Sequence, residues 1–170
     1  MDRETLKALQ APFKTRYQAD PASAVGTLKV SGEVTFDRPG CRSSLLPNDG
    51  THLIAGLHPM VGGDGSEACS GDLLLQALVT CAGTTLAAVS ISMGLTIRQA
   101  TLEATGVMDF RGTLGVDRNT PVGFTQMELV FRIDSDGDPA TLDKLVELTE
   151  RYCVVLQTLT KSVPVRSHRL

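Results

Sequence analysis

A run of 25 residues without a charged side chain, 73–97, constrains the fold of this chain more than any other feature. A long helix that lacks a charged face must either be buried on all sides in a soluble protein or cross a bilayer. Polar side chains lie around the whole circumference of this segment, Gly83 interrupts it, and its flanks carry no basic excess. We therefore expect a central helix buried in the core or at an interface, and no membrane contact.

Segments with the period-two pattern of strands lie on both sides of this run. Before it they are 24–36, 41–46 and 52–57, separated by predicted turns at 37–40 and 47–50 and followed by a loop over 58–72. After it they are 96–110 and 123–133, joined by an extended glycine-rich connection, with an edge strand at 163–165. The pattern predicts an α+β fold with antiparallel sheets.

Two further helices are predicted. Residues 2–18 have apolar side chains at helical spacing, but Pro12 in their middle predicts a short, broken helix or arm. Asp138 followed by Pro139 is typical of a helix start, and an amphipathic pattern continues from there to Leu156. We expect residues 1–23 to form an N-terminal helical arm and residues 24–170 to form the main domain.

Composition excludes some classes of function. Sixteen Lys and Arg against 19 Asp and Glu give a net charge of −3, with no basic cluster and only 4% aromatic residues, which argues against nucleic-acid binding. The charged N-terminus lacks the apolar run of a secretory signal, so we expect a cytoplasmic protein with reduced cysteines. The cysteines form no CxxC pair and the histidines have no ligand spacing, so no metal site is expected.

Two of the four cysteines lie on predicted helix faces that can meet. Cys81 shares its face of the uncharged helix with small residues, and Cys153 lies on the apolar face of the later helix. A nucleophilic cysteine must be a thiolate, and the dipole of its own helix fades too early to stabilise Cys81. A cation from elsewhere in the chain or from a second subunit is then required, and the candidates are Arg38, Arg42 and Arg111. Ordinary packing of each cysteine is the alternative.

Three segments carry a resemblance to a known family. Residues 71–81 and 151–159 resemble the two cysteine-bearing helices of the OsmC/Ohr superfamily, the osmotically inducible and organic hydroperoxide resistance proteins, and residues 109–116 are similar to the hairpin region between those helices. The resemblance covers most of residues 24–168. It implies an α+β fold in which two chains interlock as a homodimer, with antiparallel sheets packed around long buried central helices.

The same resemblance implies a thiol-dependent reduction of organic hydroperoxides. Cys81 attacks the peroxide, Cys153 resolves the oxidised sulfur into a disulfide, and an external dithiol restores both thiols. An arginine of the early hairpin, for which Arg38 and Arg42 are the nearest matches, stabilises the thiolate. Asp72 either orients that arginine or serves as a first-turn helix charge. No metal or nucleotide cofactor is implied.

The chain departs from the family pattern in three places, one of which is the segment 1–23, because the short members have no counterpart to it. Gly71 stands where the hydroperoxide reductases have a glutamate ten residues before the first cysteine, and Val154 stands where a proline typically follows the second. Two other interpretations stay open. One is a non-catalytic module that binds an apolar small ligand in the interface pocket. The other is a dinucleotide site at 63–68, whose GxGxxA pattern lacks a preceding strand.

Overall fold

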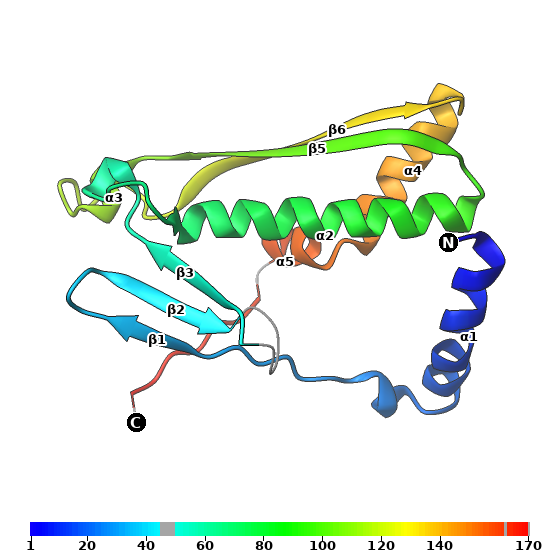
Figure 1. Cartoon of the computed structure of the whole chain (residues 1–170), viewed down its shortest axis with the longest axis horizontal. Coiled ribbons are helices and arrows are strands. Elements are labelled where there is room, and N and C mark those ends of the chain that lie inside the picture. The colour runs from blue at the N-terminus through cyan, green and yellow to red at the C-terminus, as the bar shows by residue number, and fades with distance from the viewer. Residues whose placement is uncertain (45–49, 162, 170) are drawn as a thin grey trace. The chain divides into compact units, whose positions relative to one another are not determined.

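The computed structural model describes residues 1–44, 50–161 and 163–169, and Figure 1 shows the order of their helices and strands. The chain forms two compact units. The helical unit comprises residues 1–18, 77–104 and 129–170, and the sheet unit comprises residues 19–76 and 105–128. Three long elements run through both units: α2 (Ser70–Met93), β5 (Ile97–Met108) and β6 (Phe124–Ser135).

The sheet unit contains a sheet of four short strands in the order β1-β2-β3-β4. Their bounds are β1 Gly32–Thr35, β2 Gly40–Ser44, β3 His52–Gly56 and β4 Ala68–Cys69. The first three pair antiparallel as predicted, with Val34 opposite Cys41 and Cys41 opposite Ala55. The expectation of a purely antiparallel sheet is wrong at its edge, because β4 pairs with β3 in parallel. The predicted turn at 47–50 lies outside the described residues except for Gly50.

Two predicted strands are shorter or missing. The strand predicted over 24–36 is reduced to β1, because its ladder with β2 begins at Gly32; a short 3-10 helix, η1 (Pro21–Ala24), precedes it. Residues 163–165 were expected to form an edge strand, but they lie exposed outside any strand. In both places the side-chain pattern suits a strand, but a strand also needs a neighbour to pair with.

The connections contain short helical turns that the sequence pattern did not predict. A 3-10 turn, η2 (Pro59–Val61), begins at His58, whose Nδ1 accepts a hydrogen bond from Met60 N at 3.0 Å. The connection after β5 is not fully extended, because Asp109 caps a one-turn helix, α3 (Phe110–Thr113). The His58 ring stacks on Phe110 with centroids 4.9 Å apart, which joins the two connections.

The long uncharged helix is confirmed as α2, and side-chain and backbone caps fix both of its ends. At its start the Cys69 sulfur accepts a hydrogen bond from Asp72 N (3.4 Å), and the Asp72 carboxylate accepts one from Cys69 N (3.1 Å). This reciprocal pair is a capping box with a thiol in the place of the usual hydroxyl. At its end Gly94 has φ +73°, and Leu95 N donates to Ser90 O at 2.9 Å.

The fully buried residues of the described chain all belong to the helical unit. On α2 they occur every fourth residue, at Leu78, Ala82, Leu86 and Ser90. The others lie on α4 (Pro139–Tyr152) or directly after it: Leu145, Thr149 and Cys153. The two buried hydroxyls donate to carbonyl oxygens one helical turn earlier, so neither is unsatisfied.

The rest of α2 is not covered within one chain. We expected this helix to be buried on all sides, whereas its own chain buries one stripe of it. By length and composition alone α2 is also apolar enough to cross a membrane, a property that core helices of soluble proteins share. The other faces of α2, which are uncharged from residue 73 on, thus stay partly or fully exposed in the single chain.

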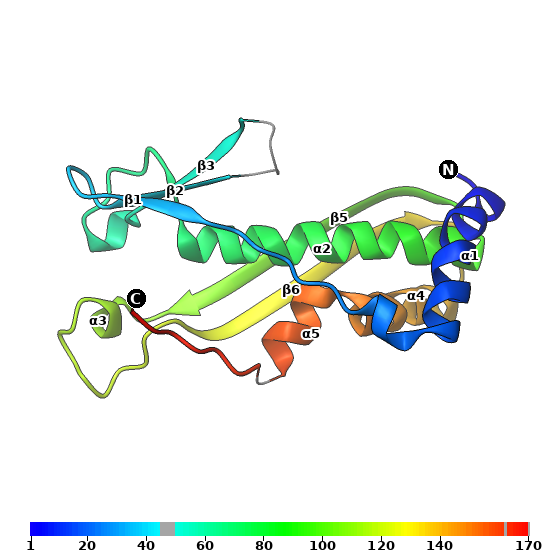
Figure 2. The same ribbon diagram turned by 90° about the horizontal axis from the view of Figure 1, so that it is seen from below.

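The strands β5 and β6 form a separate two-stranded sheet and lie side by side in Figures 1 and 2. Side-chain contacts give their direction. Ser135 donates to Thr96 O at 2.9 Å near one end, and Thr125 donates to Val107 O at 3.2 Å near the other. The pair is therefore antiparallel, as predicted.

The predicted start of the later helix is confirmed and the predicted break of the first helix is wrong. Asp138 caps α4 by accepting from Thr141 N at 3.0 Å, with Pro139 at the first helical position. The first helix, α1 (Arg3–Ala19), continues through Pro12. Asp2 caps its start by accepting from Thr5 N at 2.8 Å, and good helix formers flank the proline, so the helix loses a hydrogen bond without ending.

Truncation of a core side chain provides a test of this packing. Leu145 is 0% exposed, so we expect Leu145→Ala to lower the free energy of unfolding by about 3 kcal/mol through lost burial and the cavity left behind. Val116, which is 72% exposed, is the control, and Val116→Ala should change it by less than about 0.5 kcal/mol. Urea denaturation measures both, and equal effects would contradict the assigned core.

Candidate functional site

The helical unit brings two thiols into contact. Cys81 lies in the middle of α2 and is partly exposed, whereas Cys153 follows α4 and is fully buried. The Cys153 thiol donates a hydrogen bond to the Cys81 sulfur. Two cysteines 72 positions apart in the sequence thus form one pair, because the buried stripes of α2 and α4 lie in the same core.

A break in the second cysteine helix produces this contact. The sequence predicts one helix from Pro139 to Leu156, but α4 ends at Tyr152 and α5 (Val154–Thr160) begins after Cys153. Cys153 has φ −72° and ψ 107°, so it is extended between the two helices. Its sulfur accepts from Leu156 N at 3.5 Å, and the Gln157 side chain donates to Glu150 O at 2.9 Å. Side chains therefore replace backbone hydrogen bonds lost at the break.

This break places the first amides of α5 beside Cys81. Burial raises the pKa of the Cys81 thiol, but hydrogen bonds from Val155 N, from the Cys153 thiol and from Val154 N outweigh it. The net result is a pKa below the ordinary value of 9.0. We expected a cation to supply this stabilisation, whereas in the helical unit backbone amides and a thiol supply it.

The pKa of Cys153 moves in the opposite direction. Burial raises it first, and the sulfur of Cys81 raises it further, because a neighbouring thiolate disfavours a second negative charge; the Leu156 amide opposes both. The two thiols therefore differ in acidity. Cys81 is the one that ionises first, and Cys153 stays protonated and acts as hydrogen-bond donor to it.

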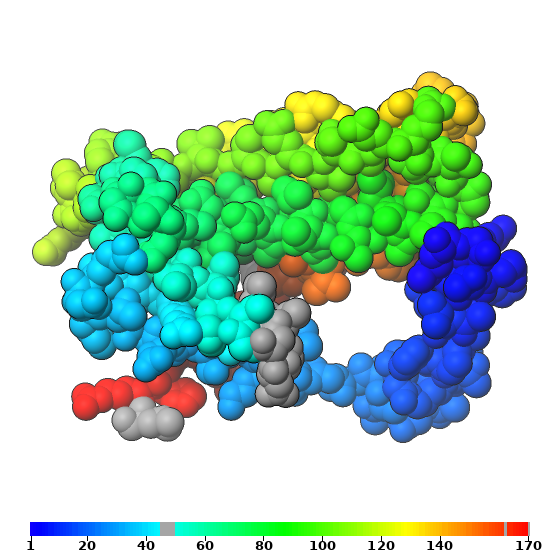
Figure 3. Space-filling view, viewed as in Figure 1, coloured from blue at the N-terminus to red at the C-terminus, as the bar shows by residue number. Residues whose placement is uncertain are grey.

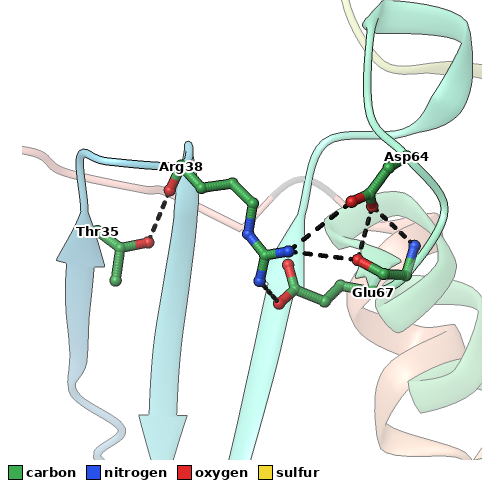
Figure 4. Close-up of polar contacts among 5 residues, drawn as sticks. Thr35, Arg38, Asp64 and Glu67 are labelled. Atoms are coloured by element: carbon green, nitrogen blue, oxygen red, sulfur yellow. Dashed lines mark hydrogen bonds and ion pairs between the residues drawn. The ribbon is translucent and has the colours of Figure 1, made fainter.

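The sheet unit holds a second polar cluster, centred on Arg38 (Figure 4). Arg38 follows β1, and its guanidinium donates to the Glu67 carboxylate at 2.5 Å and to Ser66 Oγ at 3.4 Å, with Asp64 at 3.8 Å. Glu67 is mostly buried, with 16% of its side chain exposed, whereas 59% of the Arg38 side chain is exposed. The mostly buried Glu67 carboxylate thus fixes the Arg38 guanidinium, which remains exposed to solvent.

The other three candidates from the sequence lie elsewhere. Arg42 is exposed on β2, opposite Glu33 of β1 and Ile54 of β3. Arg111 forms an ion pair with Asp109 at 2.5 Å, and this pair lowers the pKa of Asp109 to about 2. The Asp72 carboxylate accepts from Cys69 N at the start of α2. Of the two roles considered for Asp72, the structure thus shows the one at the helix start.

Sequence reasoning missed two features of these sites. The amides of α5 were hidden because no proline or glycine marks the break at Cys153. Glu67 was missed because it lies in a loop, where no periodic pattern indicates which side chains are buried. The structure also explains the glycine at position 56 of β3, because a Cβ there would lie 2.6 Å from the Glu67 carboxylate.

The remaining candidate sites find no support in the described residues. No group of three His, Cys, Asp or Glu side chains there is arranged to hold a metal ion. The GxGxxA pattern at 63–68 leads into β4, so it does not open a helix, and its Asp64 and Glu67 side chains make the polar contacts of the Arg38 cluster. Carboxylates at this position oppose the binding of a pyrophosphate.

Comparison with known proteins supports the resemblance seen in the sequence. The model of the OsmC-like protein family matches residues 63–168, which include both helices of the thiol pair. No curated protein matches the chain significantly.

Solved structures share the fold at low sequence identity. An OsmC-like protein from Mycoplasma pneumoniae superposes with a TM-score of 0.64 at 16% identity, covering 79% of this chain and 88% of the other. A putative osmotic stress induced and detoxification response protein from Psychrobacter arcticus gives 0.61 at 19%, covering 79% and 89%. An organic hydroperoxide resistance protein from Elizabethkingia anophelis gives 0.59 at 16%, covering 78% and 88%.

The opposite pKa shifts predict how the thiols react with an alkylating agent. Iodoacetamide should modify Cys81 with a midpoint below pH 9.0, because only the thiolate reacts and hydrogen bonds stabilise it. Cys153→Ala removes one donor and should move this midpoint upward. Cys153→Ser keeps a donor at that position and is the matched control. Mass spectrometry of the Cys81 peptide across a pH series measures all three, and identical midpoints would show that Cys153 does not stabilise the thiolate.

Proposed function

Because the chain belongs to the OsmC-like protein family, we propose that it is a thiol peroxidase that reduces organic hydroperoxides with Cys81 and Cys153. The observation that carries the proposal is the contact between two thiols whose pKa values are shifted in opposite directions. A peroxidase of this kind needs one thiolate to attack and one thiol to resolve. Cys81 suits the first role because it is partly exposed, and Cys153 suits the second because it is buried beside it.

The proposed first step is attack of the Cys81 thiolate on the distal oxygen of the hydroperoxide. A sulfur–oxygen bond forms, the oxygen–oxygen bond breaks, and the alkoxide leaves as an alcohol after taking a proton. Cys81 is thereby oxidised to a sulfenic acid. The Val154 and Val155 amides that stabilised the thiolate remain beside the sulfenic acid and hold it toward Cys153.

The second step follows from the electrostatics of the pair. While Cys81 is a thiolate it raises the pKa of Cys153, and its oxidation to a neutral sulfenic acid removes that charge. Cys153 then ionises more easily, attacks the Cys81 sulfur and expels hydroxide, which takes up the released proton as water. An external dithiol reduces the resulting disulfide by two exchange steps and returns both thiols.

Arg38 is our proposed guanidinium for the developing alkoxide. Its ion pair with Glu67 fixes the side chain, while more than half of it stays exposed and can donate to a ligand. Glu67 also offers an explanation for Gly71, the position at which the family resemblance leads us to expect a glutamate. In this chain the carboxylate that holds the arginine comes from the loop before β4 instead of from the first turn of α2.

We further propose that the protein works as a homodimer. Its own chain buries only every fourth residue along α2, and the uncharged remainder of the helix needs an apolar cover. A second copy supplies the same uncharged surface, as self-complementary symmetric interfaces do. The uncharged faces of α2 next to Cys81 also favour an organic hydroperoxide over hydrogen peroxide.

Thiol counting tests the redox pair. One equivalent of cumene hydroperoxide should remove two free thiols per chain, because Cys81 and Cys153 become a disulfide. Cys81→Ser should abolish this loss. Cys153→Ser should stop at the sulfenic acid, which dimedone traps on Cys81. Cys41→Ser and Cys69→Ser are the controls and should leave the loss unchanged. Oxidation no faster than that of free cysteine would instead support the non-catalytic binding module.

Substitution of arginines tests the second part of the proposal. Arg38→Met should lower kcat/KM for the hydroperoxide by about 100-fold, since it removes a donor to the leaving oxygen. Glu67→Gln should cause a smaller loss, because the guanidinium remains but is less well fixed. Arg132→Met is the matched control, since Arg132 has the same side-chain exposure as Arg38 (59%) and pairs with Glu103. A loss in Arg42→Met without one in Arg38→Met would assign the role to Arg42.

A further inference from the structure

The break between α4 and α5 changes the partners of three backbone amides. In a continuous helix Val154 N would donate to Glu150 O, and the next two amides would donate in the same way to carbonyls one turn earlier. The bonds on both sides of these three keep helical spacing. Cys153 N donates to Thr149 O and Gln157 N donates to Cys153 O, both at 2.9 Å. The change is therefore confined to three consecutive amides.

Each of these amides has a sulfur atom as its new partner. Val154 N and Val155 N donate to the Cys81 sulfur. Leu156 N donates to the Cys153 sulfur at 3.5 Å. Figure 1 shows α5 beside the middle of α2, and in the space-filling view of Figure 3 its atoms, in orange, lie directly below those of α2. The thiol pair therefore accepts hydrogen bonds from all three amides.

The carbonyl oxygen of Glu150 is the acceptor that Val154 N leaves. The Gln157 side chain donates to it, with Nε2 at 2.9 Å from Glu150 O. Gln157 follows Glu150 by seven residues, about two helical turns, and helical side chains lean toward the N-terminus, so this side chain reaches back across the break. The carboxamide thus replaces the Val154 amide at a carbonyl that would otherwise compete for that amide.

The local sequence does not by itself require an extended residue at position 153. Neither proline nor glycine occurs at 152–155. Val154 has an N–H that can return to Glu150 O, whereas the proline that the family resemblance leads us to expect there has none. A proline would also favour the extended conformation of Cys153, which has φ −72° and ψ 107°. In this chain a side-chain hydrogen bond takes the place of that covalent constraint.

We propose that Gln157 is a positioning residue that keeps the helix broken at Cys153. By occupying Glu150 O it keeps Val154 N directed at Cys81. Without the carboxamide, Val154 N regains Glu150 O, the helix continues through residue 153, and Cys81 loses hydrogen bonds from α5. The inference rests on the proposed function only in that catalysis uses the Cys81 thiolate.

A neutral substitution isolates this effect from charge. Gln157→Met keeps the length of the side chain, removes its donor and changes no charge. The titratable group that contacts Cys81 is the Cys153 thiol, and the charged residues before the break, Glu150 and Arg151, are exposed. All three are retained in the variant, so a change in the acidity of Cys81 reports the hydrogen bonds from α5.

Alkylation of Cys81 by iodoacetamide across a pH series tests the inference. Gln157→Met should raise the midpoint by about one pH unit, the shift that corresponds to the loss of one hydrogen bond to a charged group. Thr158→Val is the matched control, because it removes another side-chain bond of α5, to Val154 O at 2.8 Å, and should leave the midpoint unchanged. Circular dichroism checks that both variants keep their helices. An unchanged midpoint in Gln157→Met would overturn the proposal, as would an equal shift in the control.

A proline at position 154 provides the second measurement. Val154→Pro has no N–H to return to Glu150 O and favours an extended residue before it, so the break no longer depends on Gln157. It also removes one donor to Cys81, and its own midpoint should lie above that of the unaltered chain. Adding Gln157→Met to Val154→Pro should then change the midpoint by less than about 0.3 pH units. A further shift of about one unit would show that Gln157 acts independently of the break and would overturn the proposal.

Alkylation uses no peroxide, so this inference and the proposed function fail separately. A midpoint shift in Gln157→Met, in a protein that does not react with cumene hydroperoxide, would support the positioning role and contradict the proposed function alone. In an active peroxidase, Gln157→Met should slow oxidation of Cys81 by about tenfold at pH values below both midpoints, where the thiolate fraction is about ten times smaller, and should have little effect above both. A loss of equal size at every pH would indicate a merely structural role and overturn the inference.

Discussion

The extended residue between α4 and α5 determines the chemistry of the thiol pair. If the helix continued through Cys153, the amides of residues 154 and 155 would bond to carbonyls one turn earlier and would be unable to reach Cys81. The break releases them, and they lower the pKa of a thiol that burial alone would raise. The same break buries the Cys153 sulfur against Cys81. One backbone conformation thus fixes the acidity of one thiol and the position of the other.

This arrangement makes the pKa of each thiol depend on the protonation state of the other. The Cys153 thiol stabilises the Cys81 thiolate by donating to it, and that thiolate in turn raises the pKa of Cys153. As the pH rises, Cys81 therefore ionises before Cys153 does. A pair with two low pKa values would place two negative charges together in a buried site, which is costly. Hydrogen bonds from backbone amides stabilise the Cys81 thiolate alone, so the pair avoids that cost.

The features that the sequence predicted correctly depend on local patterns. The absence of charge over 73–97 predicts α2, and Asp138 with Pro139 predicts the start of α4, because capping and periodicity act within a few residues. The features it missed depend on distant contacts. Residues 25–31 have the pattern of a strand but no neighbour, and Glu67 matters only because Arg38 lies across from it. The break at Cys153 is also of this kind, since Gln157 and the core around Thr149 stabilise it.

Apolar surface that the chain itself leaves uncovered on two helices connects its fold to its proposed association with a second copy. In α2 the uncharged faces outside the buried stripe, and in α1 the apolar stripe, are not buried by the same chain. Single exposed apolar residues are common on protein surfaces, but contiguous apolar faces along two helices are not. If a second copy covers both surfaces, association supplies the burial of apolar surface that a single chain lacks. Folding of the core around the thiols and assembly of the chains are then coupled.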